Sequence, residues 1–216
     1  MPADKPHEPF GFADRLAFGQ RPVQAVQFVK DPNPGRTFAE PLTRFETITY
    51  RELWERAGAI ASAWTSKPVR AGDRVCLLGY LSMDHVLIDV ALIRLGAVAV
   101  PLQAGAAVTQ LRTIVAEAEP KVIAASIGYL PDALELVLTG HAPTRLVVFD
   151  QQPEVDHHQE AVKAARRRLA RAHTPVIVET LADVLSRGKR LPPAPTFAAP
   201  DVVVAYVSNL RLLGLV

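Results

Sequence analysis

Short apolar runs alternate with amphipathic helical stretches through the middle of this chain, and this alternation limits the fold more than any other feature. The apolar runs are bounded by turn residues or prolines and cover residues 75–79, 98–100, 122–125 and 146–149. Consecutive parallel strands need a crossover connection between them, which is usually a helix. The alternation therefore predicts an α/β fold with a largely parallel sheet and helices on both of its faces.

Capping signals mark the helices between these runs. Thr49 and Glu52 have the spacing of a capping box, so a helix is predicted to begin at this point. Ser82 is a suitable N-cap for a second helix that reaches Leu95, and Gly96 is a suitable left-handed terminator. Apolar periodicity predicts further helices at 108–118, 131–139, 154–172 and 181–186, and the remaining strands are expected at 176–178 and 201–208.

Proline distribution divides the chain into three parts. Residues 1–44 contain seven prolines, so we interpret them as a lead-in in which only 23–29 form a strand. Residues 45–193 carry the α/β pattern. Residues 194–216 are expected to form a proline-rich connector, a last strand and an apolar tail.

Composition excludes several classes of protein. Apolar residues make up 49% of the 216 residues, which is ample for a buried core. The formal net charge of +2 provides no field that would attract nucleic acid, and no run is long enough to cross a membrane. Cys76 is the only cysteine, so no disulfide can form within the chain, and we expect a cytoplasmic protein.

Several polar residues are candidates for chemistry, and each has a simpler structural explanation. Ser82 and Asp84 lie where helix capping accounts for them without nucleophilic or base catalysis. The basic run 163–171 is expected to be the solvated face of a helix rather than a phosphate site. His157 and His158 are adjacent and have no cysteine nearby, so no metal site is expected. No Gly-x-Gly-x-x-Gly or Gly-Lys-Ser/Thr motif is present.

Two segments resemble the acyl-adenylating superfamily of acyl-CoA ligases, peptide-synthetase adenylation domains and luciferases. They are residues 71–75, with the sequence Ala-Gly-Asp-Arg-Val, and residues 91–103, which contain Arg-Leu-Gly-Ala-Val-Ala-Val-Pro. Further stretches resemble the carboxylic acid reductases of actinobacteria in particular, and they are residues 44–54, 108–111, 123–126, 145–150 and 178–185. The resemblance implies that residues 45–193 form part of an AMP-binding (adenylation) domain, within the N-terminal subdomain of such an enzyme.

The same resemblance implies a chemistry and a set of partners. Enzymes of this kind use ATP and magnesium to convert a carboxylic or fatty acid into an acyl-adenylate. They then pass the acyl group to a phosphopantetheine thiol and reduce the thioester to an aldehyde with NADPH. The family continues its strand into a loop rich in glycine, serine and threonine with a lysine, which cradles the ATP phosphates.

This chain departs from the family at that loop. Tyr206 and Ser208 match its beginning, Val207 replaces a threonine, and residues 209–216 contain no lysine and only one glycine. Tyr206 and Ser208 are therefore the only candidate cofactor-binding residues, and no catalytic or metal-binding residue is assigned.

Three hypotheses about function follow. The first is an N-terminal fragment of an acid-activating enzyme, inactive alone, whose last residues are not family sequence because the reading frame is interrupted or the gene model is cut. The second is one half of a split enzyme, which a separately encoded downstream chain completes. The third is a non-catalytic module that binds a partner through an exposed sheet edge.

Overall fold

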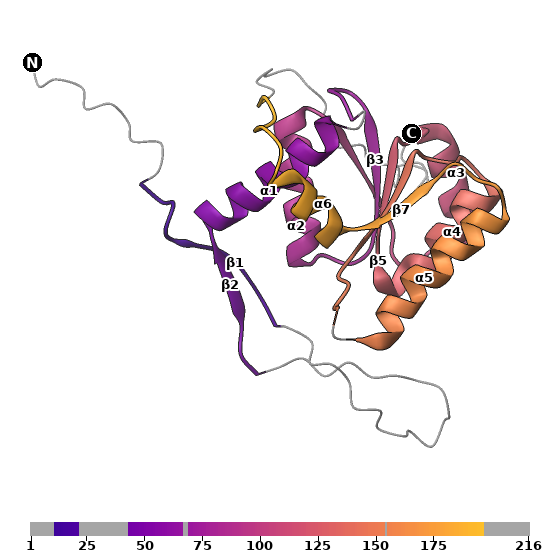
Figure 1. Cartoon of the computed structure of the whole chain (residues 1–216), viewed down its shortest axis with the longest axis horizontal. Helices are drawn as coiled ribbons and strands as arrows, with labels where there is room; N and C mark the ends of the chain where they lie inside the picture. Colours follow the sequence, from indigo (N-terminus) through magenta and orange to yellow (C-terminus); the bar gives the residue numbers. More distant parts are fainter. Residues whose placement is uncertain (1–10, 22–42, 67–68, 154, 197–216) are drawn as a thin grey trace, which may run out of the picture.

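The structure is a computed structural model, and it describes residues 11–21, 43–66, 69–153 and 155–196 (Figure 1). The predicted strands 23–29 and 201–208 lie outside these ranges. Five parallel strands form the central sheet, in the order β4-β3-β5-β6-β7. The strands are β3 (Arg74–Leu78), β4 (Val98–Leu102), β5 (Val122–Ser126), β6 (Arg145–Phe149) and β7 (Ile177–Thr180).

Within the described ranges, six helices cover this sheet, and Figure 1 shows them in two groups on its opposite faces. One face carries α1 (Tyr50–Thr65), α2 (Met83–Leu95) and α6 (Leu181–Gly188). The other face carries α3 (Val108–Ala118), α4 (Leu130–Thr139) and α5 (Asp156–Arg171). The predicted α/β class is therefore confirmed, with a parallel sheet between two helical layers.

Alternate residues of the three central strands β3, β5 and β6 enter the two separate cores. On β3, Cys76 and Leu78 pack with α3, α4 and α5, whereas Val75 and Leu77 pack with α1 and α2. All four side chains are almost fully buried. A strand that is buried on both faces has apolar residues at every position, which explains why these runs are continuous rather than alternating.

The predicted helix caps are confirmed. The Thr49 hydroxyl accepts a hydrogen bond from the Glu52 amide, and the Glu52 carboxylate accepts one from the Thr49 amide. Ser82 accepts from the His85 amide at the start of α2, which ends at Gly96 with a φ of 64°. Thr180 and Asp183 form a second capping box at α6, which the sequence analysis missed.

Pro101 does not end its strand, contrary to the sequence prediction. β4 continues through it to Leu102, and Pro101 pairs with Leu77 of β3. Among the described strands, β4 is an outer strand of the five-stranded sheet, so a residue that lacks an N–H is tolerated there.

The interpretation of 1–44 as a lead-in was also incomplete. β1 (Leu16–Gln20) pairs antiparallel with β2 (Glu46–Thr49) to form a separate two-stranded sheet beside α1. β2 provides Ile48, which is buried, and its last residue is the N-cap of α1. The hairpin is therefore tied to the main body through the capping box.

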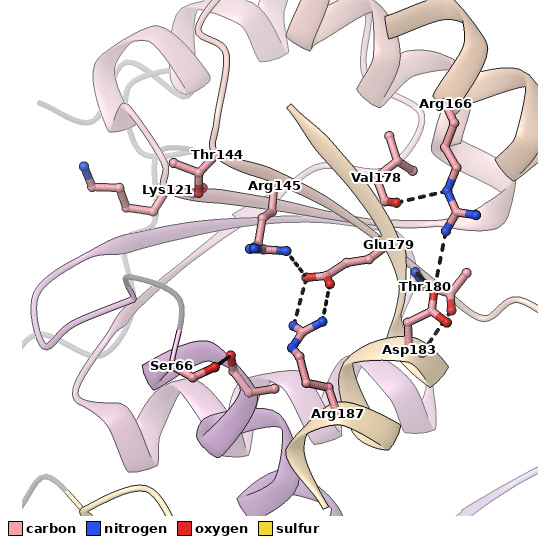
Figure 2. Close-up of polar contacts among 11 residues, drawn as sticks. Ser66, Lys121, Thr144, Arg145, Arg166, Val178, Glu179, Thr180, Asp183 and Arg187 are labelled. Atoms are coloured by element: carbon pink, nitrogen blue, oxygen red, sulfur yellow. Dashed lines mark hydrogen bonds and ion pairs between the residues drawn. The ribbon is translucent and has the colours of Figure 1, made fainter. Parts of the chain in front are cut away.

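A buried ion-pair cluster joins β6, β7 and α6 (Figure 2). The Glu179 carboxylate lies 3.0 Å from Arg145 Nη1 and 2.6 Å from Arg187 Nη1. The Glu179 and Arg145 side chains are only 7% and 9% exposed, so each charge is stabilised by its partner rather than by water. Because both arginines donate to Glu179, we interpret the cluster as structural.

No helix in the described part of the chain is long and apolar enough to span a bilayer.

Candidate functional site

The strand order places a topological switch point between β3 and β5. The chain passes from β3 to β4 on one side, and then returns to add β5, β6 and β7 on the other side. In open α/β sheets, ligands bind outside the carboxyl ends of the strands at this point. The candidate site is therefore formed by the residues that follow β3, β5 and β6.

Gly79 allows these strand ends to approach closely. A Cβ atom at this position would lie 2.9 Å from Phe149 Cζ and 3.0 Å from Ser126 Cβ, which is too close for a side chain. Glycine at position 79 therefore brings the ends of β3, β5 and β6 together. Ser126 is buried at this junction.

Two tyrosines lie next to the switch point. The rings of Tyr80 and Tyr129 make an edge-to-face contact with centroids 5.8 Å apart. A hydrogen bond with Tyr80 is the main cause that raises the pKa of Tyr129 to about 12. Tyr80 and the adjacent Leu81 are 69% and 71% exposed, so an aromatic and apolar surface faces outward at this edge.

The N-terminus of α2 is linked to the end of β6 by a carboxylate. Asp84 Oδ2 accepts a hydrogen bond of 2.9 Å from the Asp150 amide. Asp150 has a φ of 55°, in the left-handed region that aspartate tolerates better than most residues. This backbone conformation directs the Asp150 amide towards α2.

The carboxyl groups of Asp84 and Asp150 are both harder to ionise than those of ordinary aspartates. Burial is the main cause that raises the pKa of Asp150 to about 6, and the charge of Asp84 raises it further, while a hydrogen bond with Ser82 acts in the opposite direction. Burial also raises the pKa of Asp84, while the hydrogen bond from the Asp150 amide and the positive charge of Arg56 lower it. A carboxyl group that titrates near neutrality can exchange a proton in this pH range.

His85 and Gln20 complete the surroundings of the link. The His85 ring makes an edge contact with Phe149 at 5.9 Å, and its Nε2 lies 3.6 Å from Asp89. Its buried Nδ1 has no hydrogen-bond partner among the described residues. Gln20 Oε1 accepts from the Met83 amide at 2.5 Å, so β1 also reaches this edge.

The residues singled out in the sequence have different outcomes. Tyr206 and Ser208 lie outside the described residues, so their expected role stays a prediction. Ser82 is a helix cap as expected, but Asp84 also accepts a hydrogen bond from Asp150, outside its own helix.

The basic helix and the cysteine were also singled out. Arg166 of the basic helix donates hydrogen bonds to the Val178 carbonyl and to the Asp183 carboxylate (Figure 2). Burial raises the pKa of Cys76 to about 12, so this thiol is protonated and packs in the core.

Asp150 is the residue that sequence reasoning missed. Its signal was its position directly after the apolar run 146–149, where the carboxyl end of a parallel strand meets the ligand-binding edge. The geometry provides one wall of a site, with two partly buried carboxyl groups and an aromatic surface. Within the described ranges, no group of three or more His, Cys, Asp or Glu side chains is arranged to hold a metal ion.

Comparison with known proteins identifies the family. The model of the AMP-binding enzyme family matches residues 26–204. The carboxylic acid reductase of Mycobacterium tuberculosis is 57% identical over 91% of this chain, and that of Mycobacterium marinum is 50% identical over 94%. The chain spans 16% and 17% of the lengths of these two relatives.

Solved structures agree with this assignment. The adenylation domain of a Mycobacterium chelonae carboxylate reductase superposes with a TM-score of 0.80 at 43% identity, over 90% of this chain and 30% of that one. The corresponding domain from Segniliparus rugosus, solved with AMP and a co-purified carboxylic acid, gives 0.79 at 41% identity, over 90% of this chain and 32% of that one. The chain belongs to the AMP-binding enzyme family, and within this family it matches part of the adenylation domain of carboxylic acid reductases.

Proposed function

We propose that this chain supplies the parallel-sheet framework of an ATP-dependent domain that activates carboxylic acids, and that adenylation requires further sequence to hold the triphosphate. In the reaction, a carboxylate oxygen attacks the α-phosphorus of ATP, which forms an acyl-adenylate and releases pyrophosphate. The observation that carries the proposal is the 57% identity to a carboxylic acid reductase, together with an intact switch point at the carboxyl edge of the sheet.

The substrate side of the proposal draws on a structural relative. The Segniliparus rugosus domain, which shares the fold of this chain, was solved with AMP and a carboxylic acid. Its similarity supports a carboxylic acid and a nucleotide as the ligands of the complete domain. Magnesium, a phosphopantetheine thiol and NADPH belong to the proposed reaction of the longer enzyme.

The need for further sequence follows from the residues themselves. Preorganised donors around developing charge are usually the largest contribution to catalysis, and loss of one donor costs about 10² to 10³ in rate. After Tyr206 and Ser208 the 216 residues contain no lysine and no glycine-rich loop. We propose residues 45–193 as the partial adenylation domain and 194–216 as a connector, a strand and a tail that differs from family sequence.

Acid-dependent ATP–pyrophosphate exchange tests the proposal. The 216-residue chain is assayed alone and then with a second polypeptide, the part of the Mycobacterium chelonae adenylation domain that the chain does not cover. We expect no exchange from the chain alone and measurable exchange from the mixture, because the second polypeptide supplies the triphosphate-binding residues.

A matched control makes the outcome decisive. The corresponding third of the Mycobacterium chelonae domain is mixed with the same second polypeptide, which shows that the domain works in two pieces. Exchange by our chain alone, or recovery with the control piece but not with our chain, would refute the proposal.

A further inference from the structure

We infer that Asp84 and Asp150 form a proton-sensitive clasp, which fixes the segment 79–82 at the carboxyl edge of the sheet. The clasp consists of three side chains, those of Ser82, Asp84 and Asp150. It lies between β6 and α2, so it adds a conformational device to the framework. All of its groups lie within this chain, and the clasp therefore does not depend on the proposed function.

The clasp joins the two elements in both directions. Asp84, in the first turn of α2, accepts a hydrogen bond of 2.9 Å from the Asp150 amide at the end of β6. In return, the carboxyl group of Asp150 forms a hydrogen bond with Ser82, the N-cap of α2. The Ser82 hydroxyl also accepts from the His85 amide at 3.1 Å, so its own proton can be donated to Asp150. Each element therefore presents a carboxyl group to the other.

Two carboxyl groups in this arrangement favour the binding of one proton. Asp84 and Asp150 are only partly exposed, and Ser82 is 7% exposed. Neither carboxyl group has a salt-bridge partner in the described part of the chain. Burial and a neighbouring like charge both disfavour the ionised form of a carboxyl group. The raised pKa of each aspartate agrees with this geometry.

Other charged and titratable groups lie near the clasp, on α1, α2 and α5. On α1, the positive charge of Arg56 acts on Asp84. On α2, His85 Nε2 lies 3.6 Å from the carboxylate of Asp89. On α5, His158 Nδ1 accepts a hydrogen bond of 3.2 Å from a loop amide that follows β6. Because imidazoles titrate in the same pH range as the clasp, the carboxyl groups must be observed directly.

The protonation state of the clasp determines how the segment 79–82 is held. This segment connects β3 to α2 and carries Tyr80, whose ring contacts Tyr129. With one proton bound, the repulsion between Asp84 and Asp150 is removed and the clasp is closed. When both are ionised, their repulsion loosens the link between β6 and the start of α2. Acid pH therefore favours the closed clasp, and the Tyr80 ring moves relative to Tyr129 as the pH rises.

NMR of the carboxyl carbons tests the coupling within the clasp. The 216-residue chain is titrated from about pH 4 to about pH 8. The carboxyl carbon of Asp150 should titrate with a midpoint of about 6. In Asp84→Asn this midpoint should fall by about 0.5 or more, because a negative charge is lost while the asparagine oxygen still accepts from the Asp150 amide. An unchanged midpoint overturns the inference.

Asp73→Asn is the matched control for this titration. Asp73 also accepts from one backbone amide, that of Arg70 at 2.7 Å. It precedes β3, however, and therefore lies at the opposite edge of the parallel sheet. The control should leave the Asp150 midpoint unchanged. A fall of equal size in both variants overturns the inference, since the fall would then come from net charge and not from the clasp.

The tyrosine rings provide an independent readout of the position of the segment. In the wild-type chain, the ring signals of Tyr80 and Tyr129 should move together with the Asp150 carboxyl signal, and in Asp150→Asn they should stay constant. Tyr129 itself does not titrate in this range, because its pKa is about 12. Tyr50, at the start of α1, is the control ring. Constant signals in the wild-type chain, or equal movement in Asp150→Asn, overturn the inference.

Discussion

Asp150 shows how a single residue joins two elements at the carboxyl edge of the sheet. It follows β6, adopts a left-handed backbone conformation, and donates its amide to the carboxylate of Asp84 on α2. Its own carboxyl group is mostly buried, beside the negative charge of Asp84. A carboxyl group in such a place resists ionisation, and this resistance couples protonation to folding.

The Asp150→Asn variant tests this coupling at the residue scale. The pKa of Asp150 is about 6 in the folded protein, against an ordinary value of 3.8. Between these values the folded state binds more protons than the unfolded state, so stability falls as the pH rises from about 4 to 6. Asparagine tolerates the left-handed region as aspartate does. Because it cannot ionise, the variant does not lose stability through this group as the pH rises. Relative to wild type, the variant should gain on the order of 2 kcal/mol between pH 4 and pH 7.

Urea unfolding at a series of pH values measures this difference. Glu160→Gln, at an exposed position of α5, is the matched control for the loss of one carboxyl group. A constant difference between Asp150→Asn and wild type across this range would contradict the account.

At the scale of elements, the contact between α1 and α6 depends on a glycine near the end of α6. Gly188 lies so close to α1 that a Cβ atom would be 1.7 Å from the carbonyl oxygen of Ala59. No rotamer change can relieve this overlap, because the neighbour is backbone. The two helices pack on the same face of the sheet, next to the Glu179 ion-pair cluster.

Gly188→Ala should therefore lower the free energy of unfolding by about 2 kcal/mol or more, since overpacking outweighs the gain in helix propensity. Gly128→Ala is the matched control, because a Cβ atom there would have no neighbour within 4 Å. Thermal unfolding of both variants measures the effect. Equal melting temperatures would show that the helices do not approach as closely as described.

The elements that the sequence predicts are those with local signals. The strands 75–79 and 122–125 are continuous apolar runs, and the capping box of Thr49 and Glu52 lies within four residues. β1 was missed because its partner β2 is separated from it by residues 21–45, so no short turn signals the pairing. The bond between Asp84 and Asp150 spans 66 positions and is created by the strand order alone. No periodicity in the sequence contains that information.

At the scale of the whole molecule, framework and chemistry are separate. The sheet, its two helical layers and the switch point are present, and they match the adenylation domains of carboxylic acid reductases. A sheet of this kind positions a nucleotide only with loops that bind its phosphates. We propose that the phosphate-binding loops belong to sequence outside this chain.

Nucleotide binding by the purified 216-residue chain tests this central claim most directly. Titration calorimetry with magnesium-ATP and with AMP should show no saturable binding up to about 1 mM, an affinity equivalent to only about −4 kcal/mol. The Segniliparus rugosus adenylation domain, which was solved with AMP, is the positive control. Saturable binding of ATP to our chain at micromolar concentration would contradict the account, because it would require a triphosphate cradle within these residues.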